Sequence, residues 1–147
     1  MLDNLLRMPL PTVLVVEDDP VILRLLEVNF ELEGFEVLLA HDGAEGLDLA
    51  KAHRETVRWR VLCVLQAGRP MPVGEDLVLQ VLQDSSLAIT PHELRRELDY
   101  LENRKLVEIH GKHGPTWSAE LTHQGVDLVE YTTAEVYPGI ARPKKWY

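Results

Sequence analysis

Basic side chains and histidines gather in one stretch of the sequence, between residues 90 and 115. They are His92, Arg95, Arg96, Arg104, Lys105, Lys112 and His113. An arginine guanidinium can pair bidentately with guanine, whereas the other cations suit phosphate oxygens. Acidic residues interleave with the arginines, among them Glu93 and Glu97, and they can form helical ion pairs instead. The stretch therefore predicts either a nucleic-acid contact surface or an ordinary solvated helix face.

The residues around these cations predict a helix over Thr90–Lys105. Thr90 suits the N-cap and Pro91 the first helical position, and Glu93 stands three residues after the cap, which completes a capping box. Leucines then recur at helical spacing and give the helix one apolar face: Leu94, Leu98 and Leu101.

Short strands are predicted on either side of a glycine-containing loop directly after this helix, over 106–109 and 116–121. A further short helix begins near Thr122. Upstream, apolar positions predict buried helices over about 57–68 and 75–83. This order of helices followed by a hairpin is that of a winged helix-turn-helix domain.

The first third of the chain has a different pattern. The apolar run Thr12–Val16 suits a strand that is buried on both faces. Asp19 can cap a helix over 20–34, which is followed by a strand over 35–40 and a second helix over 44–53. The sequence thus predicts a β-α-β-α unit with a parallel strand pair.

The stretch VLVVEDDPVILRLLEVNFELEGFEVLLAHDGAEGLDLA resembles the first β-α-β-α of bacterial response-regulator receiver domains, which are flavodoxin-like. The resemblance implies that Glu17 and Asp18 hold Mg²⁺, a cation that suits clustered carboxylates. Asp19 matches the third acid of the family. The position of the phosphoryl-accepting aspartate is Gln66, so no phosphoacceptor is expected and the receiver is incomplete.

The second part of the chain is similar to small winged-helix proteins of Mu-like phages, often described as ArsR-like regulators. The similarity covers about 59–147 and is carried by RWRVLCVLQAGRP, ITPHELRRELDYLENRKLVEI, GPTWSAELTHQGVDLVEYT and PGIARPKKWY. Two resemblances in one chain raise the alternative of a natural or engineered chimera.

Charge divides the chain in the same place. The net charge is -9 over 147 residues. Residues 1–53 hold 3 basic and 11 acidic residues (3 - 11 = -8), whereas 54–147 hold 12 and 13 (12 - 13 = -1). Any nucleic-acid binding must therefore come from a local patch. The single Cys63 and the absence of a basic leader or a long apolar run favour a cytoplasmic protein without a membrane span.

Few other residues have the types and spacing that a structural metal site or a catalytic site needs. His110 and His113 with the remote Cys63 do not make the four-ligand pattern of structural zinc. The sequence contains no recognisable set of catalytic residues, so we expect a protein that is not an enzyme. We expect no cofactor other than the Mg²⁺ implied at Glu17 and Asp18.

Together these observations predict an α+β protein: a partial flavodoxin-like β-α-β-α unit joined to a winged helix-turn-helix domain. The expected divisions are a receiver-like segment over 11–53, the winged domain over 55–132 and an extended basic and aromatic tail over 133–147. The expected function is DNA-binding transcription regulation without phosphorylation control. The alternative is a protein-interaction or assembly module. Either way, the uncovered sheet edge predicts a homodimer or another protein partner.

Overall fold

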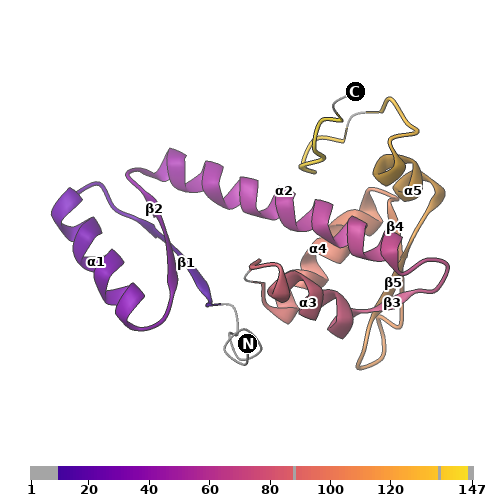
Figure 1. Cartoon of the computed structure of the whole chain (residues 1–147), viewed down its shortest axis with the longest axis horizontal. Helices are drawn as coiled ribbons and strands as arrows, with labels where there is room; N and C mark the ends of the chain where they lie inside the picture. Colours follow the sequence, from indigo (N-terminus) through magenta and orange to yellow (C-terminus); the bar gives the residue numbers. More distant parts are fainter. Residues whose placement is uncertain (1–9, 88, 136, 146–147) are drawn as a thin grey trace, which may run out of the picture.

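The computed structural model describes residues 10–87, 89–135 and 137–145 (Figure 1). Within them the elements are β1 (Thr12–Val16), α1 (Pro20–Leu32), β2 (Glu36–Ala40), α2 (Gly43–Ala67), β3 (Val73–Gly74), α3 (Glu75–Asp84), α4 (Pro91–Asn103), β4 (Val107–His110), β5 (Ser118–Leu121) and α5 (His123–Glu130). No helix in this part of the chain is long and apolar enough to cross a membrane.

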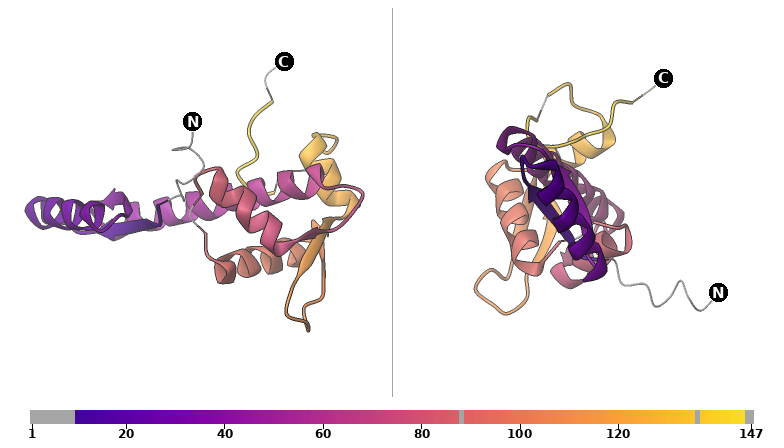
Figure 2. Two further views of the ribbon diagram at one scale, coloured as in Figure 1. Left: turned by 60° about the horizontal axis from the view of Figure 1, so that its bottom comes forward. Right: turned by 90° about the vertical axis from the view of Figure 1, so that its left-hand side faces the viewer.

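β1 and β2 pair in parallel at one end of an elongated molecule (Figure 2), with Thr12 opposite Glu36 and Val16 opposite Ala40. Asp19 caps α1 as predicted, because its carboxylate accepts hydrogen bonds from the backbone N–H groups of Val21 at 2.8 Å and Ile22 at 3.2 Å. The predicted β-α-β order is confirmed.

α2 corrects the prediction of two separate helices over 44–53 and 57–68. It is one helix of 25 residues, and it runs from the parallel strands into the rest of the molecule (Figure 1). No glycine or proline lies between Gly46 and Gly68 to end it. Thr56, the β-branched residue at the predicted junction, donates its hydroxyl to the Ala52 carbonyl at 2.9 Å and stays helical.

The complete flavodoxin-like unit is not confirmed. Among the described residues, the sheet that contains β1 has two strands. The apolar run 61–65, where a receiver has its third strand, lies inside α2. Gln66 is likewise helical, and its side-chain amide donates to Glu130 at 2.9 Å. The predicted α+β fold class is confirmed. The N-terminal part is a β-α-β unit, and α2, which follows it, continues into the second part.

The second part has the winged-helix arrangement. α3 and α4 follow α2. An antiparallel sheet of order β3-β5-β4 joins β3, which precedes α3, to the two strands after α4, with Val107 opposite Leu121. The capping box of α4 is present as predicted: Thr90 Oγ1 accepts from the Glu93 N–H at 3.2 Å, and Glu93 accepts from the Thr90 N–H at 3.0 Å. The loop between β4 and β5, called the wing below (residues 111–117), projects from the domain (Figures 1 and 2).

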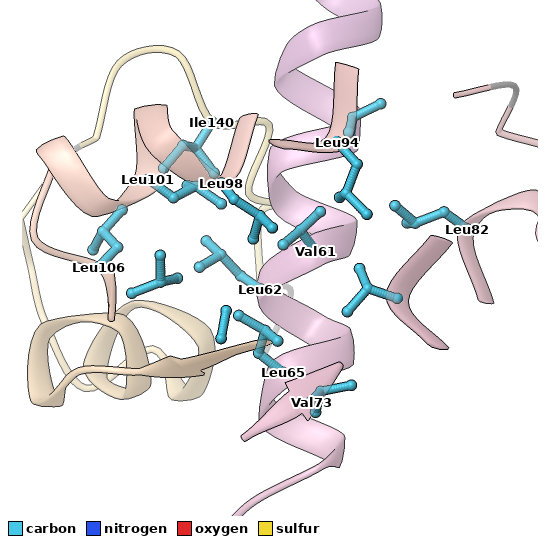
Figure 3. Packing of buried hydrophobic residues seen from close by; sticks show 14 of the residues in the cluster. Val61, Leu62, Leu65, Val73, Leu82, Leu94, Leu98, Leu101, Leu106 and Ile140 are labelled. Atoms are coloured by element: carbon cyan, nitrogen blue, oxygen red, sulfur yellow. The ribbon is translucent and has the colours of Figure 1, made fainter. Parts of the chain in front are cut away.

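One buried cluster holds this second part together (Figure 3). Val61, Leu62, Leu101 and Leu106 have no exposed surface. The remaining members come from α2, α3, α4, the sheet, α5 and the tail: Val57, Leu65, Val73, Val78, Leu82, Ile89, Leu94, Leu98, Val107, Ala119, Leu128 and Ile140. The predicted apolar face of α4 therefore lies in this core.

The tail between Tyr137 and Lys145 packs back onto the helices. Ile140 is 9% exposed, and the N–H of Ala141 donates to the Glu55 carbonyl of α2 at 3.1 Å. The Arg142 guanidinium donates to the Leu128 carbonyl of α5 at 3.3 Å. These contacts join the tail to α2 and α5. Trp146 and Tyr147, the last two residues of the predicted aromatic tail, lie outside the described residues.

Candidate nucleic-acid interface

Glu75 fixes α4 relative to α3 and the wing. It begins α3 and is 8% exposed, and its carboxylate accepts from Arg95 Nε at 2.7 Å and Nη2 at 2.5 Å. The same carboxylate accepts from the backbone N–H of Trp117 at 3.0 Å. Hydrogen bonding from Arg95 is the main reason that the pKa of Glu75 lies below its usual range, against the opposing effect of burial. One acid thus joins three segments.

Arg95, one of the predicted contacts, is engaged inside the domain. Besides Glu75, its guanidinium donates to the Pro115 carbonyl at 3.0 Å and lies 4.7 Å from the centre of the Trp117 ring. Both partners belong to the wing. The geometry makes Arg95 a residue that positions the wing against α4.

A second ion pair fixes α4 against α2. Arg58 Nε and Glu97 Oε2 are 2.5 Å apart, and Glu97 is 2% exposed. The Arg58 guanidinium also lies 3.5 Å from the centre of the Tyr100 ring and donates to the Gly139 carbonyl at 2.9 Å. Burial of a paired charge of this kind demands complete hydrogen bonding, which the tail helps to supply.

Two further predicted contacts also have partners within the molecule. Arg104 donates to the Tyr100 hydroxyl at 2.8 Å and to the Pro138 carbonyl at 3.1 Å, which ties it to the tail. Lys112 Nζ lies 2.5 Å from Asp99 and 2.7 Å from Glu102, both on α4. Asp99 and then Glu102 raise the pKa of the Lys112 ammonium. The base of the wing is thereby attached to α4.

The other predicted contacts are exposed: His92, Arg96, Lys105 and His113. The Arg96 side chain is 57% exposed and has only a 3.8 Å approach to Glu97. Lys105 follows α4 directly, with a backbone φ of 61°. Arg96 also lines a groove of about 730 Å³ between the first turn of α4 and the β1–β2 sheet. These side chains remain open to a partner.

The predicted Mg²⁺ ligands lie far from α4, at the end of β1. The Glu17 carboxylate accepts from the Asp19 N–H at 3.0 Å, and Asp18 is exposed. Within the described residues these acids belong to no group of three with ligand atoms within 4.8 Å of one another. Mg²⁺ binding there remains a prediction.

Sequence reasoning missed Glu75, and it placed Glu97 in a helical ion pair where the structure has a buried pair with Arg58 of α2. Glu75 carries a weak signal, because an acid at the first position of a helix suits the helix dipole. Glu97 carries none, since its partner Arg58 stands 39 residues earlier in the sequence.

The fold and the site define a winged helix-turn-helix domain that is fused through α2 to a small β-α-β unit. No known family model matches the chain. A stretch of 38 residues is 47% identical to the uncharacterized transcriptional regulatory protein YkoG of Bacillus subtilis (strain 168). That stretch is 26% of this chain and only 17% of YkoG.

Two solved structures have similar chains. One describes a mechanism for regulation of DNA binding of Bordetella bronchiseptica BpsR by 6-hydroxynicotinic acid, with a TM-score of 0.40, 24% identity, and coverage of 52% of this chain and 50% of that one. The other is a single-site mutant of MepR from a multidrug resistant S. aureus clinical isolate, with a TM-score of 0.44, 18% identity, and coverage of 76% and 70%. At these scores and identities, neither likeness assigns a function.

Proposed function

We propose that the protein is a DNA-binding transcriptional regulator that contacts duplex DNA through α4 and the wing. The observation that carries the proposal is the fixed arrangement of these two elements around Glu75 and Arg95, whose Nε and Glu75 Oε2 are 2.7 Å apart. A helix fits the major groove of B-DNA, and a neighbouring hairpin can then reach the backbone. Preorganisation of this kind reduces the ordering cost of binding.

The exposed cations supply the contacts. Arg96 on α4 reads a base edge or meets a phosphate, while Lys105 after α4 and His113 on the wing meet phosphates. His92, in the first turn of α4, is placed for either role. Arg95, Arg104 and Lys112 position these elements through their contacts inside the domain. Few cations are open, so affinity for mixed-sequence DNA is modest and strongly salt-dependent.

A fluorescence anisotropy titration of a mixed-sequence duplex tests this assignment. Arg96→Ala should weaken binding and reduce the slope of log K against log salt by about one unit, because one phosphate contact is lost. The matched control is Arg24→Ala on α1, which removes the same charge from an exposed 2.6 Å pair with Glu27. Equal losses in the two variants would contradict a specific role for α4.

A second candidate function is association with protein, and the exposed apolar side chains of α1 favour it. Val21 is 76% exposed, Leu25 59% and Leu32 80%. β1 and β2 are each hydrogen-bonded to only one described strand, so both sheet edges are open. We infer that this unit mediates homodimerisation or binds another protein. Phosphorylation does not control this association, and the protein has no enzymatic activity.

A further inference from the structure

The outer face of the β4–β5 hairpin carries three side chains with metal-ligating atoms. Val107 and Ala119 face the core, with 2% and 1% exposure. Because side chains alternate along a strand, Glu108, His110 and Glu120 lie on the opposite, solvent-facing side. None of the three belongs to the proposed DNA contacts.

The three ligand groups lie close together. Glu108 stands directly opposite Glu120 in the strand register, and His110 follows two residues after Glu108 on the same face. His110 Nε2 and Glu120 Oε1 are 3.7 Å apart, and one ligand atom from each of the three residues lies within 4.8 Å of the others. Pairing of two adjacent strands therefore builds this cluster.

The charged side chains at Glu108, His110 and Glu120 favour the binding of a cation. Two carboxylates directly opposite each other on neighbouring strands repel and destabilise the pairing. The nearby ammonium of Lys112 is held by Asp99 and Glu102, at 2.5 Å and 2.7 Å. Among the ion pairs of the described residues, Glu120 has only His110 and Glu108 has no partner. A bound divalent ion would relieve this repulsion.

We propose that Glu108, His110 and Glu120 bind one divalent transition-metal ion of the Zn²⁺ type. Zinc accepts imidazole nitrogen and carboxylate oxygen ligands at about 2.0–2.2 Å, so two ligands of one ion lie up to about 4 Å apart. The 3.7 Å separation of His110 and Glu120 meets that limit already. Glu108, whose ligand atom lies within 4.8 Å of the other two, completes a three-ligand set, with water in the fourth position. Imidazole in the set selects Zn²⁺, Co²⁺ or Ni²⁺ over Mg²⁺.

Titration of the full chain with Co²⁺, followed by its visible absorption, and then displacement by Zn²⁺ test this site. His110→Ala and Glu120→Gln should each weaken binding by at least about tenfold, because even the loss of a group that only supports a metal ligand costs about that much. His123→Ala is the matched control, because it removes an exposed histidine of α5 that belongs neither to this cluster nor to the proposed DNA contacts. Zn²⁺ should also raise the melting temperature of the wild-type chain and the control, but not that of the two ligand variants.

Binding that is unchanged in both ligand variants, or no spectral change with Co²⁺ at all, would overturn the proposal. So would an equal loss in the His123→Ala control. The readout is ion binding to the protein alone, so its outcome does not depend on whether DNA is bound.

Discussion

The two parts of the molecule bury their apolar side chains to very different extents. In the winged part, Val61, Leu62 and Leu101 are completely buried within one cluster that spans helices, sheet and tail. In the β-α-β unit, by contrast, Val21 is 76% exposed and Leu32 80%. The buried hydrophobic residues of that unit are Val15, Leu23 and Ala40.

The difference follows from the number of layers. A helix or sheet has to bury its apolar face against another element, and a two-stranded sheet packed on α1 and α2 is too small to bury the outward apolar side chains of α1. A groove of about 730 Å³ separates the sheet, at Leu14 and Leu38, from α3 and α4. Stability should therefore reside in the winged part, and α2 should connect the β-α-β unit to it.

Two leucines, one from each part of the molecule, should differ most in their contribution to stability. Leu62→Ala, at a position with no exposure, should lower the free energy of unfolding by about 2–5 kcal/mol, because it leaves a cavity in the core. Leu25→Ala, on α1 and 59% exposed, should change it by less than about 0.5 kcal/mol. Urea unfolding followed by circular dichroism measures both. Similar losses in the two variants would contradict the comparison.

A smaller effect is expected at Glu75. Glu75→Gln should cost about 1–3 kcal/mol, because Arg95 keeps a buried partner without its charge. The folded-state pKa of Glu75 is depressed, chiefly by Arg95, so its stabilisation is present above about pH 4.5 and is lost as pH falls through the folded value.

Unfolding of wild type and Glu75→Gln at neutral pH and at about pH 3 measures this contribution. The difference between them should shrink in acid. A difference that is independent of pH would show that the Glu75 carboxylate charge does not hold α3, α4 and the wing together.

The smallest effect on stability is expected on the exposed face of α1. Leu25→Lys should leave the melting temperature within a few degrees of wild type, because the side chain already faces solvent. It should nevertheless weaken self-association, since it places a charge in the apolar patch. Sedimentation velocity over a range of concentrations measures this. The matched variant Leu77→Lys, on α3 and 54% exposed, should leave association unchanged.

Local patterns predicted the elements better than they predicted their connections. The capping box of α4 and the Asp19 cap of α1 are satisfied by residues two or three positions away, so the sequence shows them directly. The continuity of α2 was missed because the change in charge and apolar pattern near residue 54 resembled a boundary, although nothing there breaks a helix.

The candidate interface was predictable only in part. Arg96 and His113 are exposed, as the sequence predicted for a solvated surface. Arg95, by contrast, is hydrogen-bonded to Glu75, 20 residues away in sequence. Similarly, Arg104 contacts the Pro138 carbonyl, 34 residues away. Tertiary packing decides which arginine of α4 stays exposed, and the spacing of the residues along the chain does not show it.

Light scattering of the protein, alone and with a mixed-sequence duplex at low and at moderate salt, shows whether α4 and the wing bind DNA. We expect a protein–DNA complex at low salt that dissociates as salt rises, since phosphate contacts weaken steeply with ionic strength. An unchanged mass with and without DNA would contradict the assignment of α4 and the wing. It would leave the apolar face of α1 as the functional surface.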